Sequence, residues 1–141
     1  MVKSQRPAQT IRLLFADTAK AIKDRSQIVT RRFGAEYVDL AKGDIIEAVS
    51  DVWMLSCPVK VPLLARLEIV AVSLEPLRRL TEDLAYAERE LQLEGIPPYI
   101  SPRSRVGEFF IRHRAVTLDS LIVRIEFRYV ESEQARPSLG A

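Results

Sequence analysis

Apolar and charged residues alternate most regularly near the end of the chain. From Val123 to Tyr129, apolar side chains occupy every second position and charged side chains fill the positions between them. Successive side chains of a strand point to opposite faces, so this pattern predicts a strand with one buried and one charged face. The segment Arg66–Leu74 is dense in β-branched residues, which favours a strand in the middle of a sheet.

Three further strands are predicted in the first half of the chain: Thr10–Phe15, Gln27–Arg32 and Ile45–Met54. Trp53, near the end of the last one, is expected to pack in the core or at its rim. Glu36–Ala41 predicts a helical turn. It leads into a tight turn at Lys42-Gly43-Asp44, in which Gly43 is free to adopt a positive φ.

Helices are predicted at three places between these strands. Asp17 can cap a short helix, and Thr81 followed by two acids can open a longer one that ends at Gly95. Ser101 and Pro102 provide a cap and a first-turn proline for a third helix. Its buried side is expected to carry apolar side chains, namely Val106, Phe109 and Phe110.

Strands with helices inserted between them predict an α+β domain. The 141 residues are enough for one domain with a substantial core and few for two. We expect a flexible N-terminus over residues 1–9, the folded domain over residues 10–130, and a disordered, polar C-terminal tail over residues 131–141.

Composition narrows the class of protein. The chain is 48% hydrophobic and 28% charged, as is typical of soluble globular proteins, and it has no apolar run long enough to span a membrane. The first residues lack the apolar stretch of a secretory signal, and the single cysteine excludes an internal disulfide. These features indicate a cytoplasmic protein.

The charges are distributed unevenly along the chain. Residues 1–34 contain eight Lys/Arg against two Asp/Glu, while the remaining residues contain 13 against 17. A basic N-terminal third can face phosphates, although an ordinary solvated surface gives the same pattern.

Most familiar catalytic and metal-binding sets are missing. His113 is the only histidine, so no histidine-rich metal site can form, and its neighbours Arg112 and Arg114 favour a surface or helix-end role. Cys57 has no base beside it in sequence and is expected to be a partly buried thiol. There is no glycine-rich phosphate loop. We therefore expect no metal and no organic cofactor.

The most informative polar residues lie in the predicted strand Gln27–Arg32. Alternation places Thr30 and Arg32 on one face and Arg31 on the other. If Thr30 and Arg32 face inward, they form a small polar pocket, because a buried arginine needs an anionic or carbonyl partner.

The same residues resemble a known family. The run Ile22–Arg32 followed by Lys42-Gly43-Asp44 resembles the N-terminal signature of ASCH domains, which belong to the PUA-like superfamily. The similarity extends from about Ile11 to Val130 and returns at three later segments, namely Glu94-Gly95-Ile96, Glu108-Phe109-Phe110 and Val123–Tyr129. The closing strand looks most like small ASCH proteins of bacteria and their phages. The resemblance implies a small, mostly antiparallel PUA-like β-barrel with surrounding helices.

One activity implied by the resemblance is hydrolysis. Some bacterial ASCH proteins are amidohydrolases that deacetylate N4-acetylcytidine, with a threonine nucleophile, a lysine three residues before it and a glutamate. The threonine corresponds to Thr30 and the glutamate to Glu94, but the lysine position holds Gln27. Glutamine cannot take the proton of a nucleophile, so this departure argues against efficient catalysis. Lys23, Arg25 and Lys42 are the substitutes in the sequence.

The leading prediction is therefore binding of RNA or a modified nucleoside, which the resemblance to PUA-like domains also implies. Gln27, Thr30, Arg32 and Glu94 offer donors and acceptors for a base, and Arg31 and Lys42 are expected near a phosphate. The alternatives are an amidohydrolase or ribonuclease that uses Thr30 and Glu94, and a phage-encoded module that binds a host protein.

The sequence also leaves open the role of Arg32 and the partner of the third predicted helix. Arg32 can instead form a buried ion pair with Glu94 or Asp44 that only stabilises the fold. The third predicted helix carries four arginines that suit a protein or a nucleic-acid partner equally, namely Arg103, Arg105, Arg112 and Arg114.

Overall fold

A computed structural model describes residues 7–56 and 63–131. The predictions for residues 1–6, for Cys57 and for the tail beyond Glu131 lie outside the described residues, as does the side chain of Trp53. The elements, in chain order, are β1 (Thr10–Leu14), α1 (Ala19–Lys23), β2 (Val29–Arg32), the 3₁₀ turn η1 (Ala35–Tyr37), β3 (Ile45–Val49), the 3₁₀ turn η2 (Val52–Leu55), β4 (Ala65–Pro76), α2 (Arg79–Glu82), α3 (Leu84–Leu93), α4 (Pro102–Arg112) and β5 (Leu121–Tyr129).

The strands form one sheet in the order β1-β3-β4-β5-β2. Only β1 and β3 run parallel, and the other neighbours are antiparallel, so the predicted α+β class and the mostly antiparallel sheet are confirmed. β4 lies in the middle, as its β-branched sequence predicts. Among the described residues no strand ladder joins β1 to β2. The closed barrel that the resemblance implied is therefore wrong, and the sheet is open between these two edges.

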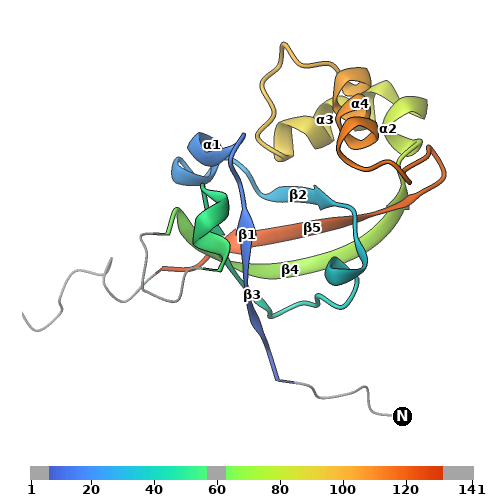
Figure 1. Cartoon of the computed structure of the whole chain (residues 1–141). Coiled ribbons are helices and arrows are strands. Elements are labelled where there is room, and N and C mark those ends of the chain that lie inside the picture. Colours follow the sequence, from blue (N-terminus) through green and yellow to red (C-terminus); the bar gives the residue numbers. More distant parts are fainter. Residues whose placement is uncertain (1–6, 57–62, 132–141) are drawn as a thin grey trace, which may run out of the picture.

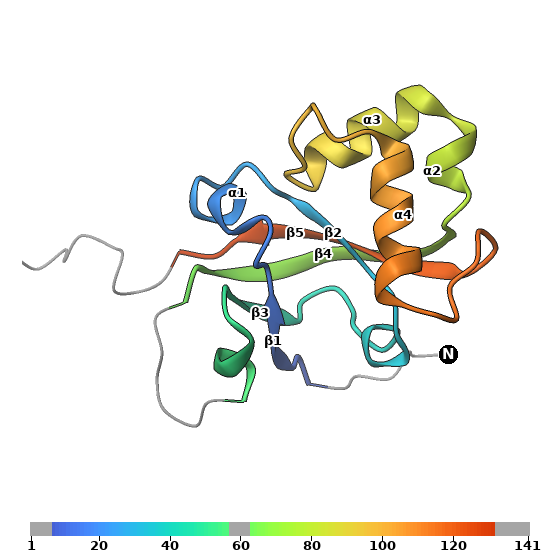
Figure 2. The same ribbon diagram turned by 45° about the horizontal axis from the view of Figure 1, so that its top comes forward.

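The core has two parts, and β5 contributes to both. Val123, Ile125 and Phe127 lie in a cluster beneath the sheet, as the alternating pattern predicts. Ile122 points the other way into a second cluster formed with the helices. Figures 1 and 2 show α2, α3 and α4 gathered beside one another, apart from α1. This helical group covers the start of β5 and gives that end of the sheet two buried faces.

Local signals predicted one helix start correctly and missed two. Ser101 caps α4, accepting a hydrogen bond of 3.1 Å from the backbone N–H of Ser104. The longest predicted helix starts later than expected: Thr81 lies in the short α2, and Asp83 caps α3 through a 3.0 Å bond from the N–H of Tyr86. Asp17 caps nothing, because Thr18 occupies the N-cap of α1 and makes no side-chain cap bond.

Two other predictions need correction. The strand predicted over Ile45–Met54 ends at Val49, and the chain then forms the 3₁₀ turn η2. Phe110 was expected on the buried side of its helix but is 42% exposed, since Val106 and Phe109 fill the contact with the second core cluster. No helix among residues 7–56 and 63–131 is long and apolar enough to cross a membrane.

Candidate functional site

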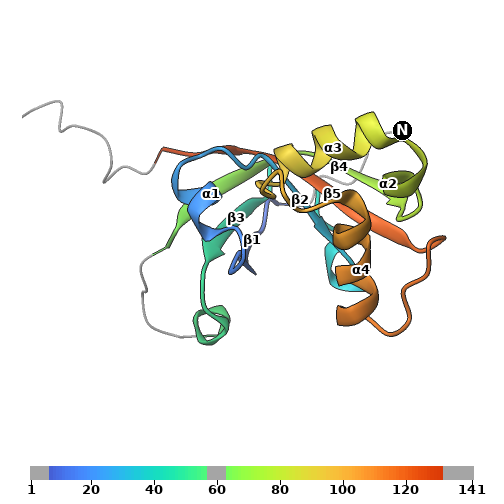
Figure 3. The ribbon, with the colours of Figure 1, turned by 90° about the horizontal axis from the view of Figure 1, so that it is seen from above.

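The strand β2 lies between α1 on one side and the α3–α4 pair on the other (Figure 3). Thr30 and Arg32 share a face, as predicted: the Arg32 Nε donates a 3.0 Å hydrogen bond to the Thr30 hydroxyl oxygen. The Arg32 Nη2 donates to the carbonyl oxygen of Leu14 at 2.8 Å, and its guanidinium carbon lies 4.7 Å from the centre of the Phe15 ring. Arg32 thus spans the open seam between β2 and β1 with its side chain.

Arg31 points to the opposite face and is the most completely paired cation of the site. Its Nη1 lies 2.8 Å from Glu94 Oε2, and its Nη2 lies 2.5 Å from Glu75 Oε1 and 2.6 Å from Glu90 Oε1. Burial alone lowers the pKa of Arg31, but the three carboxylates, Glu94 first, raise it well above its ordinary value. Arg31 is therefore a buried structural cation, and not the exposed cation that the phosphate prediction requires.

Glu94 connects β2 to α4. It occupies the C-cap of α3, where Gly95 follows with a φ of +73°. Its Oε2 faces Arg31, and its Oε1 accepts from Arg105 Nη2 at 2.8 Å and Arg105 Nε at 3.2 Å. The ion pair proposed for Arg32 with Glu94 or Asp44 is wrong, since Arg31 and Arg105 take both oxygens of Glu94. The hydrogen bonds of half-buried Arg32 go to Thr30 and to the Leu14 carbonyl instead, and desolvation lowers its pKa.

Gln27 lies just before β2 and is only 2% exposed. Its side-chain Nε2 donates to the carbonyl oxygen of Val29 at 2.9 Å, and its backbone carbonyl accepts from the Tyr129 hydroxyl at 2.6 Å. Burial, with help from the nearby Asp24 carboxylate, raises the pKa of Tyr129 to about 12. Tyr129 therefore stays a neutral donor, and both Gln27 amide groups are held in place.

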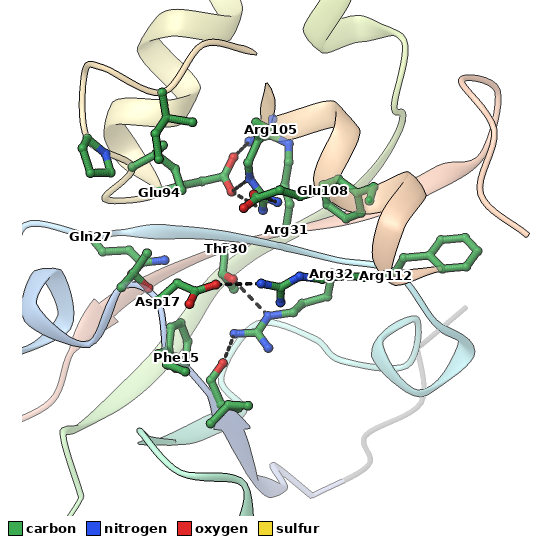
Figure 4. Close-up of a pocket in the computed structure, with 18 of the residues that line it drawn as sticks. Phe15, Asp17, Gln27, Thr30, Arg31, Arg32, Glu94, Arg105, Glu108 and Arg112 are labelled. Atoms are coloured by element: carbon green, nitrogen blue, oxygen red, sulfur yellow. Dashed lines mark hydrogen bonds and ion pairs between the residues drawn. The ribbon is translucent and has the colours of Figure 1, made fainter. Parts of the chain in front are cut away.

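These residues line a pocket of about 590 Å³, which Figure 4 shows from close by. Its wall combines the polar groups of Gln27, Thr30, Arg32, Glu94 and Arg105 with several rings, namely Phe15, Phe33, Tyr37, Tyr99 and Phe109. Asp17 and Arg112 form an ion pair of 2.7 Å across the pocket, between the segment before α1 and the end of α4. Tyr99 is 85% exposed at its rim.

The backbone geometry has counterparts among solved structures. By sequence, the chain matches no protein-family model and no curated protein. The structure of an ASCH domain from Lactobacillus crispatus JV V101 superposes with a TM-score of 0.59 at 16% identity, covering 86% of this chain and 79% of that one. This chain has the ASCH fold. Protein EF3133 from Enterococcus faecalis V583 is similar at a TM-score of 0.53 and 14% identity, over 92% of this chain and 83% of that one. Hypothetical protein PH0355 is similar at a TM-score of 0.55 and 12% identity, over 88% of this chain and 100% of that one.

The ASCH fold brings five of the six predicted site residues to one pocket: Gln27, Thr30, Arg31, Arg32 and Glu94. Lys42 is the exception. It is exposed in the turn before β3 and is not part of the pocket lining. The turn itself is confirmed, with Gly43 at a φ of +95°. The buried Asp44 carboxylate accepts from the backbone N–H groups of Gln9 and Ala41, both at 3.0 Å.

Sequence reasoning placed the arginines of α4 on an interaction surface and missed that two of them face the pocket. Arg105 and Arg112 are seven residues apart and share a helix face with Phe109, a spacing that identifies one side of a helix. Arg103 and Arg114 are exposed and do not line the pocket. The seven-residue spacing was the available signal, but only the packing of α4 shows which face it marks.

The arrangement is better suited to holding a ligand than to activating a nucleophile. Thr30 Oγ1 accepts from Arg32, and a guanidinium cannot take up the hydroxyl proton. The pocket lining among the described residues contains no lysine, so neither Lys23 nor Lys42 replaces the amine that Gln27 lacks. Within the described part of the chain, no group of three or more His, Cys, Asp or Glu side chains is arranged to hold a metal ion.

Proposed function

We propose that this ASCH domain binds RNA or a modified nucleoside, with a base in the pocket beside Gln27, Thr30 and Arg32, and without efficient catalysis. The observation that carries the proposal is the composition of this wall, in which fixed hydrogen-bonding groups alternate with aromatic rings in a volume of about 590 Å³. Pockets of this size suit ligands of nucleoside dimensions. Unpaired bases are recognised by stacking on rings and by hydrogen bonds to their edges.

Positive charge at the rim supports an RNA strand as the larger ligand. Arg112 is exposed at the pocket beside its ion-pair partner Asp17, and Arg103 and Arg114 are exposed near it, in the first turn of α4 and just after the C-cap of α4. Arginines in such positions contact phosphates without reading the sequence. Lys42 and Arg31 are not needed for this role.

The site favours binding over hydrolysis because each candidate catalytic group is already engaged. Glu94 pairs through one oxygen with Arg31 and through the other with Arg105. Thr30 faces the Arg32 donor. Removing one member of a catalytic unit usually removes most of its activity, and Gln27 stands at the lysine position. For the amidohydrolase or ribonuclease alternatives, Glu94 and Thr30 would first have to give up these contacts.

The proposal is tested by measuring the anisotropy of short labelled single-stranded RNAs with the wild-type protein and three single variants. Tyr99→Ala and Arg112→Gln remove a rim ring and a rim charge, and each is expected to weaken binding by about five- to tenfold. Arg66→Gln is the matched charge control, because Arg66 is exposed on β4 and lies outside the pocket lining. Equal affinity of all four proteins would exclude the pocket as the RNA site.

Arg31 is unsuitable for this test. A variant that removes Arg31 and Arg32 together would leave Glu75, Glu90 and Glu94 without their shared cation, so a loss of RNA binding would report unfolding. Thr30→Val is the better interior variant, since it keeps the shape and removes only the hydroxyl.

A further inference from the structure

Three of the four polar groups of Gln27 are satisfied, and the fourth is not. The backbone N–H donates to the Ala21 carbonyl at 3.2 Å, the backbone carbonyl accepts from Tyr129, and Nε2 donates to the Val29 carbonyl. The remaining atom, Oε1, is buried in the pocket wall. Among the described residues it is the only buried side-chain nitrogen or oxygen that has no hydrogen-bond partner.

The orientation of the Gln27 amide is fixed. Turning it over would place Oε1 against the carbonyl oxygen of Val29 and replace a 2.9 Å hydrogen bond by a repulsion between two acceptors. The position therefore offers an acceptor and never a donor. A buried acceptor without a partner costs free energy, which a ligand donor in the same place would recover.

Neighbouring acceptors in the wall each already accept at least one hydrogen bond. Both oxygens of Glu94 accept from arginines, and Thr30 Oγ1 accepts from Arg32. Gly95 adds no side chain over this part of the wall: a Cβ there would lie 3.5 Å from Gln27 Oε1 and 2.6 Å from the Cβ of Ala21. The backbone of Gly95 thus packs closely against Ala21 and Gln27, and a larger residue there would press on the Gln27 side chain.

We propose that Gln27 Oε1 selects the ligand, by accepting a hydrogen bond from an N–H of a heterocyclic base. The inference rests on the proposed binding function and narrows it to bases that present an amino or ring N–H group at this point. Full alkylation of that nitrogen removes the donor and leaves Oε1 desolvated opposite an apolar group, so the site rejects the alkylated base.

The experiment compares pairs of nucleosides by titration calorimetry. The pairs are cytidine with N4,N4-dimethylcytidine, adenosine with N6,N6-dimethyladenosine, and uridine with N3-methyluridine. 5-Methylcytidine controls for added size, because it gains a methyl group and keeps its amine. For the nucleoside that binds best, we expect full alkylation to weaken wild-type binding at least about tenfold, while the size control binds within about threefold of its parent.

Two variants separate the acceptor from the rest of the pocket. In Gln27→Met, which has similar length and no amide oxygen, the parent and alkylated nucleosides should bind with nearly equal affinity. In Tyr99→Ala, both members of the pair should weaken together and their ratio should stay as in the wild type. The wild-type comparison decides by itself if Gln27→Met does not fold.

The outcomes distinguish this inference from the function on which it rests. Wild-type protein that binds a nucleoside and its fully alkylated form equally would overturn the role of Gln27 and leave nucleoside binding intact. Selectivity that persists in Gln27→Met would also overturn it, because another group would then accept the N–H. Absence of binding to any of these nucleosides and to single-stranded RNA would overturn both.

Discussion

Arg31 Nη1 lies 2.8 Å from Oε2 of Glu94, a residue 63 positions later in the chain. The same guanidinium also pairs with Glu75 and Glu90, and its side chain is only 1% exposed. One cation from β2 therefore joins the end of β4, at Glu75, to the last turn of α3, at Glu90 and Glu94. Glu94, held in this way, forms part of the pocket wall. The ligand site and the core ion cluster share this carboxylate.

Replacing Arg31 should destabilise the fold strongly. Arg31→Met would leave three carboxylates, two of them nearly inaccessible, without their common partner, and we expect a loss of about 3–5 kcal/mol in the free energy of unfolding. Arg128→Met is the matched control, because Arg128 pairs with Glu68 but is 65% exposed. That change should cost less than about 1 kcal/mol. Urea denaturation followed by circular dichroism measures both, and equal losses would contradict the structural role of Arg31.

Acid should weaken the same cluster. Burial raises the pKa of Glu90, but hydrogen bonds from Arg124 and Arg31 outweigh it, and the pKa lies below its ordinary value of 4.5. A carboxyl whose folded pKa is lowered stabilises the fold above its unfolded pKa, and this contribution is lost as the pH falls through the folded value. The free energy of unfolding should therefore drop below about pH 4.5.

Arg124→Gln provides the control for this acid effect. Arg124 donates to both oxygens of Glu90, so without it the pKa of Glu90 should rise toward its ordinary value. Denaturant titrations at a series of pH values should then show a shallower loss of stability in the variant. Parallel pH profiles for the two proteins would mean that other carboxyls dominate.

Alkali should break the hydrogen bond from the Tyr129 hydroxyl to the Gln27 backbone carbonyl. A group whose folded pKa is raised stabilises the fold below its unfolded pKa, and that contribution is lost as the pH rises through the folded value. For Tyr129 the window runs from the ordinary value of 10.0 to about 12. The phenolate absorbance of wild-type protein should contain a component near 12 that Tyr129→Phe lacks. If Tyr129→Phe instead removes a component that titrates near 10, the Tyr129 hydroxyl is not held as described.

The cap of α3 can be tested by two neighbouring substitutions. Asp83→Ala should lower the free energy of unfolding by about 0.5–2 kcal/mol, because it removes the acceptor for the Tyr86 N–H. Thr81→Ala should have a smaller effect, since Thr81 Oγ1 donates to the carbonyl of Arg78, the N-cap residue of α2, and does not cap α3. Thermal unfolding of both variants shows which one loses more stability. A larger loss of stability in Thr81→Ala would support Thr81 as the helix cap, as the sequence predicted.

Gln27 also decides the enzymatic alternative. Wild-type protein incubated with N4-acetylcytidine should release no cytidine, because the described pocket lining contains no lysine to accept the proton of Thr30. Gln27→Lys introduces an amine whose pKa burial would lower, and it should gain measurable turnover. The double variant Gln27→Lys/Thr30→Val should lose that gain. Release of cytidine by the wild type would move hydrolysis ahead of binding.

Features that depend on neighbours along the chain could be predicted from the sequence alone. The alternation from Val123 to Tyr129 predicted β5 and its buried face, and Ser101 with Pro102 predicted the start of α4. These signals work because a strand has a period of two residues and a cap involves the next turn only. The shared face of Thr30 and Arg32 follows from the same period.

Which arginine is buried in the ion cluster and which faces the pocket depends on how the helices pack against β2. Alternation separates Arg31 from Arg32 but does not show that the helical group covers the second face of β2. The partners of Arg31 come from β4 and α3, more than 40 positions away in sequence. Contacts at such separation depend on how the elements pack, and packing also left Gln27 with one unpaired oxygen at the ligand site.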